Sequence, residues 1–151
     1  MYLQDVKLYR DTIVEQLLSN EAIVELIRPE DAPFTKPRDL LYKHIYPYDH
    51  IIEKTTEAET FLCFDIEAPR IIGRAFTEFR IYFWIMTHDR RIVTPKGLRG
   101  DLLSSEIEKV MNGSKDFGIG RVELKSWGRF APAEKFHGRS LIYETVDFNR
   151  E

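Results

Sequence analysis

The sequence predicts an α+β protein in which one antiparallel sheet, made of two hairpins, has its helices packed on one face. Two helical stretches come first, two alternating stretches follow, and a third helix precedes two closing alternating stretches. Two hairpins with a helix between them fold most simply into a single sheet covered by helices. A chain of 151 residues has the usual size of one domain, so we expect a single α+β domain over residues 1–151.

The helical stretches are recognised by apolar residues at three- and four-residue steps. Residues 3–18 repeat this pattern, and Asn20 is placed to cap a second, short helix that ends at Ile27. The pattern recurs over residues 101–112, where Asp101 is the expected cap. We therefore expect three helices.

Residues 28–58 show neither the helical spacing of apolar residues nor the alternation typical of a strand, and they contain four prolines. Each proline removes a backbone donor and favours extended geometry before it. A loop of this length is uncommon in a compact domain and is often functional. Its strongly apolar stretch, residues 40–48, predicts a short strand or an arm that packs on another surface, such as a second subunit.

The strands are recognised by apolar residues that alternate with a period of two. This pattern covers residues 59–67 and 77–88, which we expect to form the first hairpin. It returns over residues 122–127 and 142–148, which form the second hairpin. A long basic connection, Gly128 to Gly138, is predicted between these last two strands.

One face of the sheet is predicted to lack helices and still to be apolar. It would carry Tyr82, Trp84 and Met86 from the second strand, with Trp127 and Tyr143 from the closing hairpin. So large an apolar surface is rarely left in contact with water. Either identical copies cover it or the long loops fold over it, and we favour a homo-oligomer. The candidate subunit contacts are Tyr42, Tyr46, Tyr48, Tyr82, Trp84, Trp127 and Tyr143.

The charge is distributed unevenly along the chain. Lysine and arginine number 22 against 25 acidic residues, for a net charge of −3. Residues 1–67 hold 7 basic and 14 acidic side chains, whereas residues 68–100 hold 7 and 2. A basic segment in an acidic chain suits a lumen, a polyanion or an acidic neighbour, and the alternative is a set of solvated loop arginines. The candidate lumen-facing or partner-facing residues are Arg70, Arg74, Arg90, Arg91, Lys96 and Arg99.

An alternative enzymatic function rests on Asp116, Glu123 and Lys125. Asp…Glu-x-Lys resembles the core of a large nuclease superfamily, in which the carboxylates hold Mg²⁺ and the lysine positions the attacking water. Glu-x-Lys is equally an ordinary solvent-facing pair on a strand. A second alternative is a nucleic-acid-binding module, in which Trp84 near Arg80 and Trp127 near Arg129 stack on bases.

No other motif predicts catalysis or a cofactor. The four histidines lack metal-ligand spacing. A metal site at His44 and His50 is a weaker interpretation of these residues than ordinary packing. Cys63 is the single cysteine, which excludes a disulfide framework and a cysteine zinc site within one chain. We expect no metal, no cofactor and no enzymatic activity. The longest apolar run is too short to cross a membrane, so we expect no membrane segment. The N-terminus is acidic and has no long apolar stretch, so we expect no signal peptide.

The order of elements resembles a tailed-bacteriophage neck protein of the tail-terminator, or head–tail joining, type. The matching features begin with the amphipathic residues 17–27 and a proline-rich loop leading to Ile45-Tyr46-Pro47. The strands Phe61 to Ile66 and Thr77 to His88, the helix Asp101 to Met111 and two closing strands follow. Another neck, tail-completion or baseplate component has a similar layout.

The resemblance implies a structural virion protein that forms a ring, commonly a hexamer. Such a ring terminates the tail tube and connects it to the head-side connector, and double-stranded DNA passes through its lumen without sequence-specific binding. The implied partners are further copies of the chain, the connector and the tail tube, and the implied location is the virion neck after synthesis in the host cytoplasm.

Overall fold

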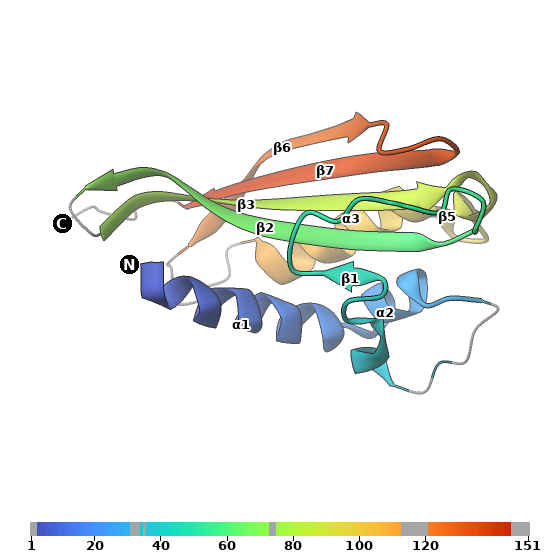
Figure 1. The fold of residues 1–151 in the computed structure, drawn as a ribbon, viewed down its shortest axis with the longest axis horizontal. Helices are drawn as coiled ribbons and strands as arrows, with labels where there is room; N and C mark the ends of the chain where they lie inside the picture. The colour runs from blue at the N-terminus through green and yellow to red at the C-terminus, as the bar shows by residue number, and fades with distance from the viewer. Residues whose placement is uncertain (1–2, 31–33, 35, 73–74, 113–120, 146–151) are drawn as a thin grey trace.

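The computed structural model describes residues 3–30, 34, 36–72, 75–112 and 121–145, which form an α+β fold (Figure 1). The helices are α1 (Val6–Leu18), α2 (Glu21–Ile27) and α3 (Arg99–Met111). The strands are β1 (Ile45–Tyr46), β2 (Thr60–Ile72), β3 (Ala75–His88), β4 (Val93–Thr94), β5 (Gly97–Leu98), β6 (Val122–Phe130) and β7 (Phe136–Thr145). The predicted fold class is confirmed.

The main sheet has five strands in the order β1-β2-β3-β7-β6, and β4 and β5 pair separately. Both predicted hairpins, β2–β3 and β6–β7, are antiparallel, and they join through β3 and β7. The edge strand β1 runs parallel to β2 and brings the long loop into the sheet. The β2–β3 hairpin projects beyond the other strands (Figure 1), because β7 pairs with β3 only from Arg80 onward among the described residues.

The helix caps follow local chemistry, with one exception. The Asn20 side chain accepts a hydrogen bond from the Ile23 amide at 2.9 Å, which confirms the predicted start of α2. Asp101 is not the cap of α3, because the helix begins at Arg99 and Leu98 occupies the cap position. Asp101 lies in the first turn, where its carboxylate interacts favourably with the positive end of the helix dipole.

The closing hairpin is tighter than its sequence indicates. β6 extends to Phe130 and β7 begins at Phe136, so the connection is far shorter than the predicted segment 128–138. Phe136 pairs with His88, and His137 pairs with Thr87. The strand β7 therefore begins before Gly138, within the segment that was predicted to be a connection. The predicted outer end of this strand, residues 146–148, lies outside the described residues.

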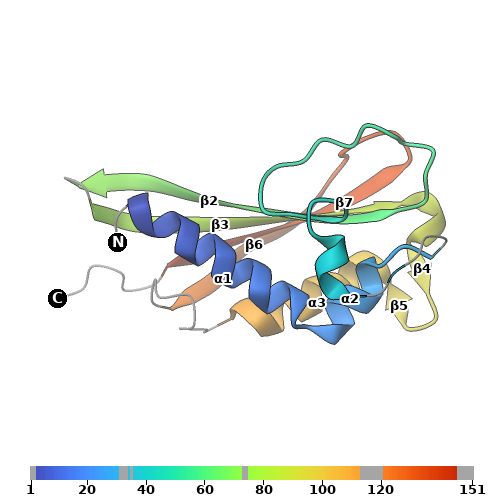
Figure 2. The same ribbon diagram turned by 60° about the horizontal axis from the view of Figure 1, so that its bottom comes forward.

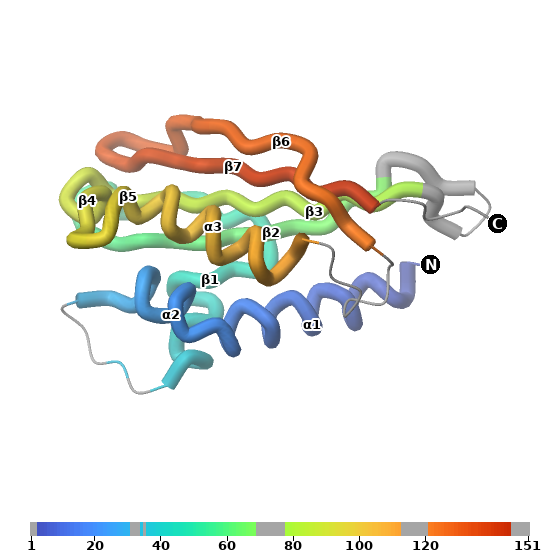
Figure 3. Tube along the Cα trace, turned by 180° about the vertical axis from the view of Figure 1, so that it is seen from behind, coloured from blue at the N-terminus to red at the C-terminus, as the bar shows by residue number. Residues whose placement is uncertain are grey.

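All three helices cover the same face of the sheet, as predicted (Figures 2 and 3). The inward side chains of β2, β3 and β7 alternate in register, so they form continuous apolar rows against the helices. This core contains Ile13 and Leu17 of α1, Ile23 and Ile27 of α2, Leu103 and Ile107 of α3, Leu62 and Phe64 of β2, Ile81 and Phe83 of β3, and Leu141 and Tyr143 of β7. Among the described residues, no helix has the length and apolarity needed to cross a bilayer.

The opposite face of the sheet is covered in part by the chain itself. Residues 47–59 arch over this face on the side away from the helices (Figure 2). A second apolar cluster lies beneath them and comprises Tyr46, Phe61, Cys63, Met86 and Phe136. The predicted alternative, in which the long loop folds over the sheet, therefore holds for this part of the face.

Two residues assigned to that outer face lie on the helix side instead. Tyr143 is fully buried, and its hydroxyl donates a hydrogen bond to Glu108 Oε2 of α3 at 2.8 Å. Trp127 donates from Nε1 to Ser104 Oγ of α3 at 3.0 Å. A bulge between Leu124 and Ser126 shifts the alternation of β6 by one residue, and this shift turns Trp127 to the helix side, where half of it stays exposed. Their assignment to the outer face is wrong, and Tyr143 is too buried to meet another subunit, whereas Trp127 remains exposed on the helix side.

Candidate functional site

The uncovered part of the outer sheet face is an aromatic stripe on β3. The rings of Tyr82 and Trp84 stack with centroids 5.7 Å apart and planes 6° apart, and both side chains are half-buried. Ile142 of β7 lies opposite Tyr82 and extends the apolar surface. We call Tyr82, Trp84 and Ile142 the outer stripe. Two flat rings beside an aliphatic side chain form a surface suited to contact with another protein.

Ion pairs border the outer stripe. Arg80 Nε lies 3.0 Å from Glu144 Oε1 across β3 and β7. On the side of β2, Asp65 accepts a hydrogen bond at 2.9 Å from Arg10, which reaches round the sheet from α1. An apolar centre with a charged border is the usual composition of a protein contact surface.

The three candidate tyrosines of the loop occupy different environments. Tyr46 is buried in the second cluster, and this burial raises its pKa to about 12. Tyr48 and Tyr42 are exposed, and Tyr42 adopts a left-handed backbone with φ of 64°. Only Tyr48 and Tyr42 are therefore placed to meet a partner.

The predicted basic residues do not converge on one surface. Arg90 and Lys96 are exposed near one end of the sheet. Arg70 belongs to the part of β2 that pairs near the tip of the β2–β3 hairpin, at the other end, and its side chain lies outside the described part. Arg74 lies outside the described residues. The charge excess of this segment is thus divided between two ends of the molecule.

Arg91 and Arg99 are structural residues, which corrects their assignment to a lumen or partner surface. Both are buried, with exposed fractions of 3% and 8%. Arg99 Nη1 donates to the Leu26 carbonyl at 2.7 Å, and Arg91 Nη2 donates to the Arg28 carbonyl at 3.1 Å. These carbonyls end α2, where a helix has unsatisfied acceptors and a partial negative charge. Burial lowers the pKa of Arg99.

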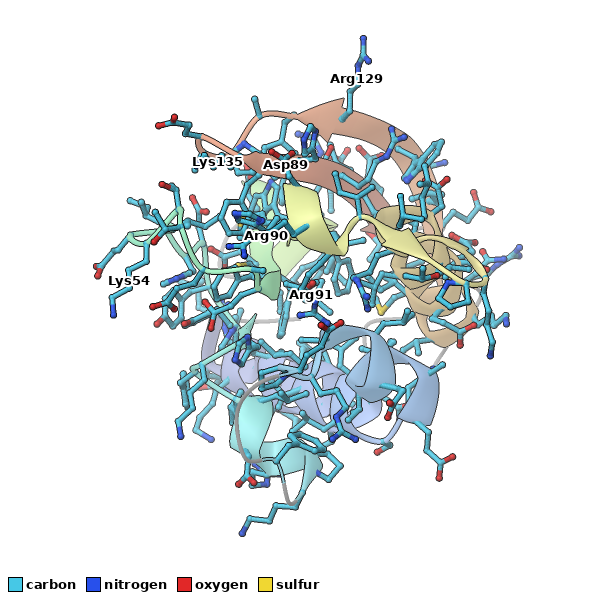
Figure 4. The ribbon with its side chains drawn as sticks, turned by 90° about the vertical axis from the view of Figure 1, so that its right-hand side faces the viewer. Lys54, Asp89, Arg90, Arg91, Arg129 and Lys135 are labelled. Atoms are coloured by element: carbon cyan, nitrogen blue, oxygen red, sulfur yellow. The ribbon has the colours of Figure 1, made fainter. Side chains whose placement is uncertain are left out.

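A different set of basic side chains gathers at the end of the sheet near Arg90 (Figure 4). Arg90 follows β3, Arg129 points outward from β6, and Lys135 lies in the β6–β7 turn. Lys54 is added by the loop that covers the outer face. We call Lys54, Arg90, Arg129 and Lys135 the basic end. Asp89 lies among them and pairs with His137, and Lys54 lies 3.7 Å from Glu57, so the positive surplus rests on Arg90, Arg129 and Lys135.

The nuclease residues are not assembled as a metal site in the described part of the chain. Glu123 forms ion pairs with Lys125 at 3.3 Å and Arg121 at 3.6 Å, and Asp116 lies outside the described residues. Among the residues that are described, no three histidine, cysteine or acidic side chains group to hold a metal ion.

His44, His50 and Cys63 are engaged in packing. His44 stacks on Phe61 with centroids 5.6 Å apart, and His50 stacks on Tyr46 at 3.8 Å. Burial raises the pKa of the Cys63 thiol to about 12, so near neutral pH this residue is protonated and a poor nucleophile.

A pocket of about 840 Å³ opens on the helix side, between α2, α3 and the β4–β5 hairpin. Its apolar lining comes from Ala22, Leu26, Pro29, Pro95 and Leu102. Five basic side chains (Arg28, Arg91, Lys96, Arg99, Lys109) and three acidic ones (Glu25, Glu30, Glu106) surround this lining. We call this concavity the helix-side pocket. It suits an apolar group that carries negative charge nearby.

These surfaces define a small α+β protein whose exposed features are an aromatic sheet stripe, a basic end and a pocket with an apolar lining. Residues 17–145 match the model of the YomW family, and the chain belongs to this family. The family is phage-type, after a YomW-like protein of Bacillus phage SPBc2, and membership indicates a phage-associated protein. No curated protein and no solved structure gave a significant match.

Sequence reasoning did not place Lys54, Arg129 or Lys135 in a basic surface with Arg90, and Arg129 was named only as the neighbour of Trp127. Lys54 lies in residues 1–67 and Arg129 and Lys135 lie in residues 101–151, and each of these large windows has a negative net charge, so counting charge in such windows does not detect them. A signal was present in the closing hairpin, because antiparallel pairing brings Arg129 close to the β6–β7 turn that holds Lys135.

Proposed function

We propose that this chain is a structural virion protein without enzymatic activity, which forms a homo-oligomeric ring at the head–tail junction of a phage. In this role the ring terminates the tail tube and joins it to the head-side connector. Its membership of a phage-type family and the resemblance in element order to tail-terminator proteins support the role.

The outer stripe is the observation that carries the proposal. The chain's own loop covers one part of the outer sheet face, and Tyr82 and Trp84 remain half-buried beside it. A second copy that covers this stripe would remove two aromatic side chains from water. Aromatic residues in such contacts often dominate the binding free energy.

The basic end supports the part of the proposal that concerns DNA. If each subunit turns this end toward the ring axis, Lys54, Arg90, Arg129 and Lys135 line the lumen. Phosphate contacts from such side chains carry no sequence information, which suits DNA that must pass through. The remaining partners, the connector and the tail tube, would meet the two rims of the ring.

Mass measurement by light scattering tests the proposal on the wild-type protein, for which we expect a defined oligomer. Trp84→Ala is expected to weaken assembly by about 2 kcal/mol or more without unfolding the protomer, as for an aromatic at an interface centre. Tyr82→Asp is expected to act in the same direction. Sedimentation measures assembly, and circular dichroism confirms the fold.

Leu8→Ala provides the control, because Leu8 is an exposed apolar residue on α1, away from the outer face. A wild-type protein that stays a single protomer at all concentrations would contradict the ring. An oligomer that Trp84→Ala leaves unchanged would contradict the use of the outer stripe.

A further inference from the structure

The loop over the outer face presents one large apolar side chain to solvent. Ile51 has an exposed fraction of 79%, the highest among the exposed large apolar residues of the described chain. It stands between two exposed carboxylates, Asp49 and Glu53. The result is an apolar projection with negative charge on both sides.

The neighbours of Ile51 hold this projection in place. His50 stacks on Tyr46 with ring centroids 3.8 Å apart and planes 5° apart. Ile52 packs against the second apolar cluster beneath the loop. Because both neighbours are anchored, Ile51 is held on the surface with little further conformational entropy to lose on binding.

The helix-side pocket complements this projection. Its acidic side chains already have partners: Glu25 lies 3.5 Å from Arg28, Glu30 lies 3.9 Å from Arg91, and Glu106 lies 2.8 Å from Lys109. Lys96 is exposed, and among the described residues no carboxylate lies within ion-pair distance of it, whereas Arg99 is buried and donates to backbone carbonyls. The pocket therefore offers apolar walls and, in Lys96, an exposed basic group for an incoming carboxylate.

The projection and the pocket lie on opposite faces of the sheet. The loop that carries Ile51 arches over the face away from the helices, whereas α2 and α3 lie on the other (Figure 2). One molecule therefore cannot use both together. Between copies they make a heterologous contact, which leaves one projection and one pocket free until a ring closes.

We infer that Ile51 of one copy of this chain enters the helix-side pocket of the next copy, with Asp49 and Glu53 on the side of Lys96. The inference rests on the proposed ring and specifies its contact. The occupant is a second copy because the chain itself presents a group with the required shape and charge. Ile51 and the outer stripe share one face, so both would meet the same neighbour.

A cysteine pair tests the contact directly. Ile51→Cys combined with Leu102→Cys, in the pocket wall, is expected to give under mild oxidation a ladder of disulfide-linked multimers on a non-reducing gel. Cys63 is buried and does not compete. Ile51→Cys with Leu8→Cys is the matched control, because Leu8 is an exposed apolar residue on α1 outside the pocket, and this pair is expected to give no ladder.

A charge exchange provides the second measurement. Glu53→Lys and Lys96→Glu are each expected to raise the dissociation constant of the assembly about tenfold, and together they are expected to restore most of the loss. Both side chains are exposed, so the protomer fold is expected to persist. Light scattering over a dilution series measures the dissociation constant.

The outcomes separate this contact from the ring itself. An assembled wild-type protein whose cysteine pair gives no ladder, or whose control pair gives an equal one, overturns the contact and leaves the ring. If combining Glu53→Lys with Lys96→Glu does not restore assembly, this result also overturns the contact and leaves the ring. A wild-type protein found only as a single protomer overturns both.

Discussion

Gly138 lies beneath the aromatic ring of Phe130, where β6 and β7 pair. A Cβ atom at this position would lie 2.7 Å from Phe130 Cζ, well inside normal contact distance. The ring itself packs against the second apolar cluster, on which the covering loop rests. Because glycine has no Cβ atom, the Phe130 ring can lie directly over Gly138, and the closing hairpin packs tightly.

We expect Gly138→Ala to lower the free energy of unfolding by about 1–2 kcal/mol, because the Phe130 ring must shift within a packed cluster. Gly128→Ala is the matched control, since its Cβ would meet Ser140 Oγ at an ordinary 3.8 Å. Denaturant unfolding of the two variants measures the difference. Equal losses in the two would show that the approach of Phe130 is not the cause.

At the scale of elements, α2 illustrates how a helix of seven residues is held at both ends. Helices this short are unstable alone, so tertiary contacts supply their stability. Asn20 caps its beginning, and Arg91 and Arg99 bind the carbonyls at its end. The arginines also join α2 to the segment that precedes α3.

Arg99→Met is expected to cost about 2–3 kcal/mol of stability, because it leaves the buried carbonyls of Leu26 and Arg91 without this donor. Methionine retains most of the aliphatic volume, so the loss reports on the hydrogen bonds.

Arg129→Met is the control for this prediction, since Arg129 is exposed, and its effect is expected to stay within about 0.5 kcal/mol. Thermal unfolding compares the two variants. If Arg99→Met were as stable as wild type, the guanidinium would not hold the end of α2.

At the scale of the whole molecule, charge is separated between surfaces. The basic end gathers four cations from the covering loop, the turn after β3 and the closing hairpin. The proposed ring would repeat this end around its axis. A few cations per subunit would then become a positive lumen, while the net charge of each chain stays at −3.

We expect the assembled protein to bind duplex DNA weakly, with an affinity that falls as salt rises. Each phosphate contact contributes about 0.9 to the slope of log affinity against log salt, so Arg90→Glu with Lys135→Glu should flatten it measurably. Fluorescence anisotropy over a salt series measures this slope. Lys43→Glu reverses an exposed charge elsewhere and is expected to leave it unchanged; an equal effect there would contradict a DNA-facing role for the basic end.

Local chemistry determined much of this fold from the sequence alone. The period of apolar residues placed three helices and both hairpins, and Asn20 marked the start of α2, because these patterns depend on neighbours within a few residues. Residues 40–48 were also expected to supply a short strand or arm. Such local patterns are enough to predict features that do not depend on contacts between distant parts of the chain.

Only the tertiary structure decided which face each aromatic residue occupies and which charges meet. One bulge in β6 turned Trp127 toward α3, and Tyr143 became buried against the same helix. Arg91 and Arg99 became helix-end ligands, whereas Lys54, Arg129 and Lys135 came together from distant segments. Strand register, bulges and long-range contacts depend on the energy of the whole packed molecule, and no local stretch of sequence contains that information.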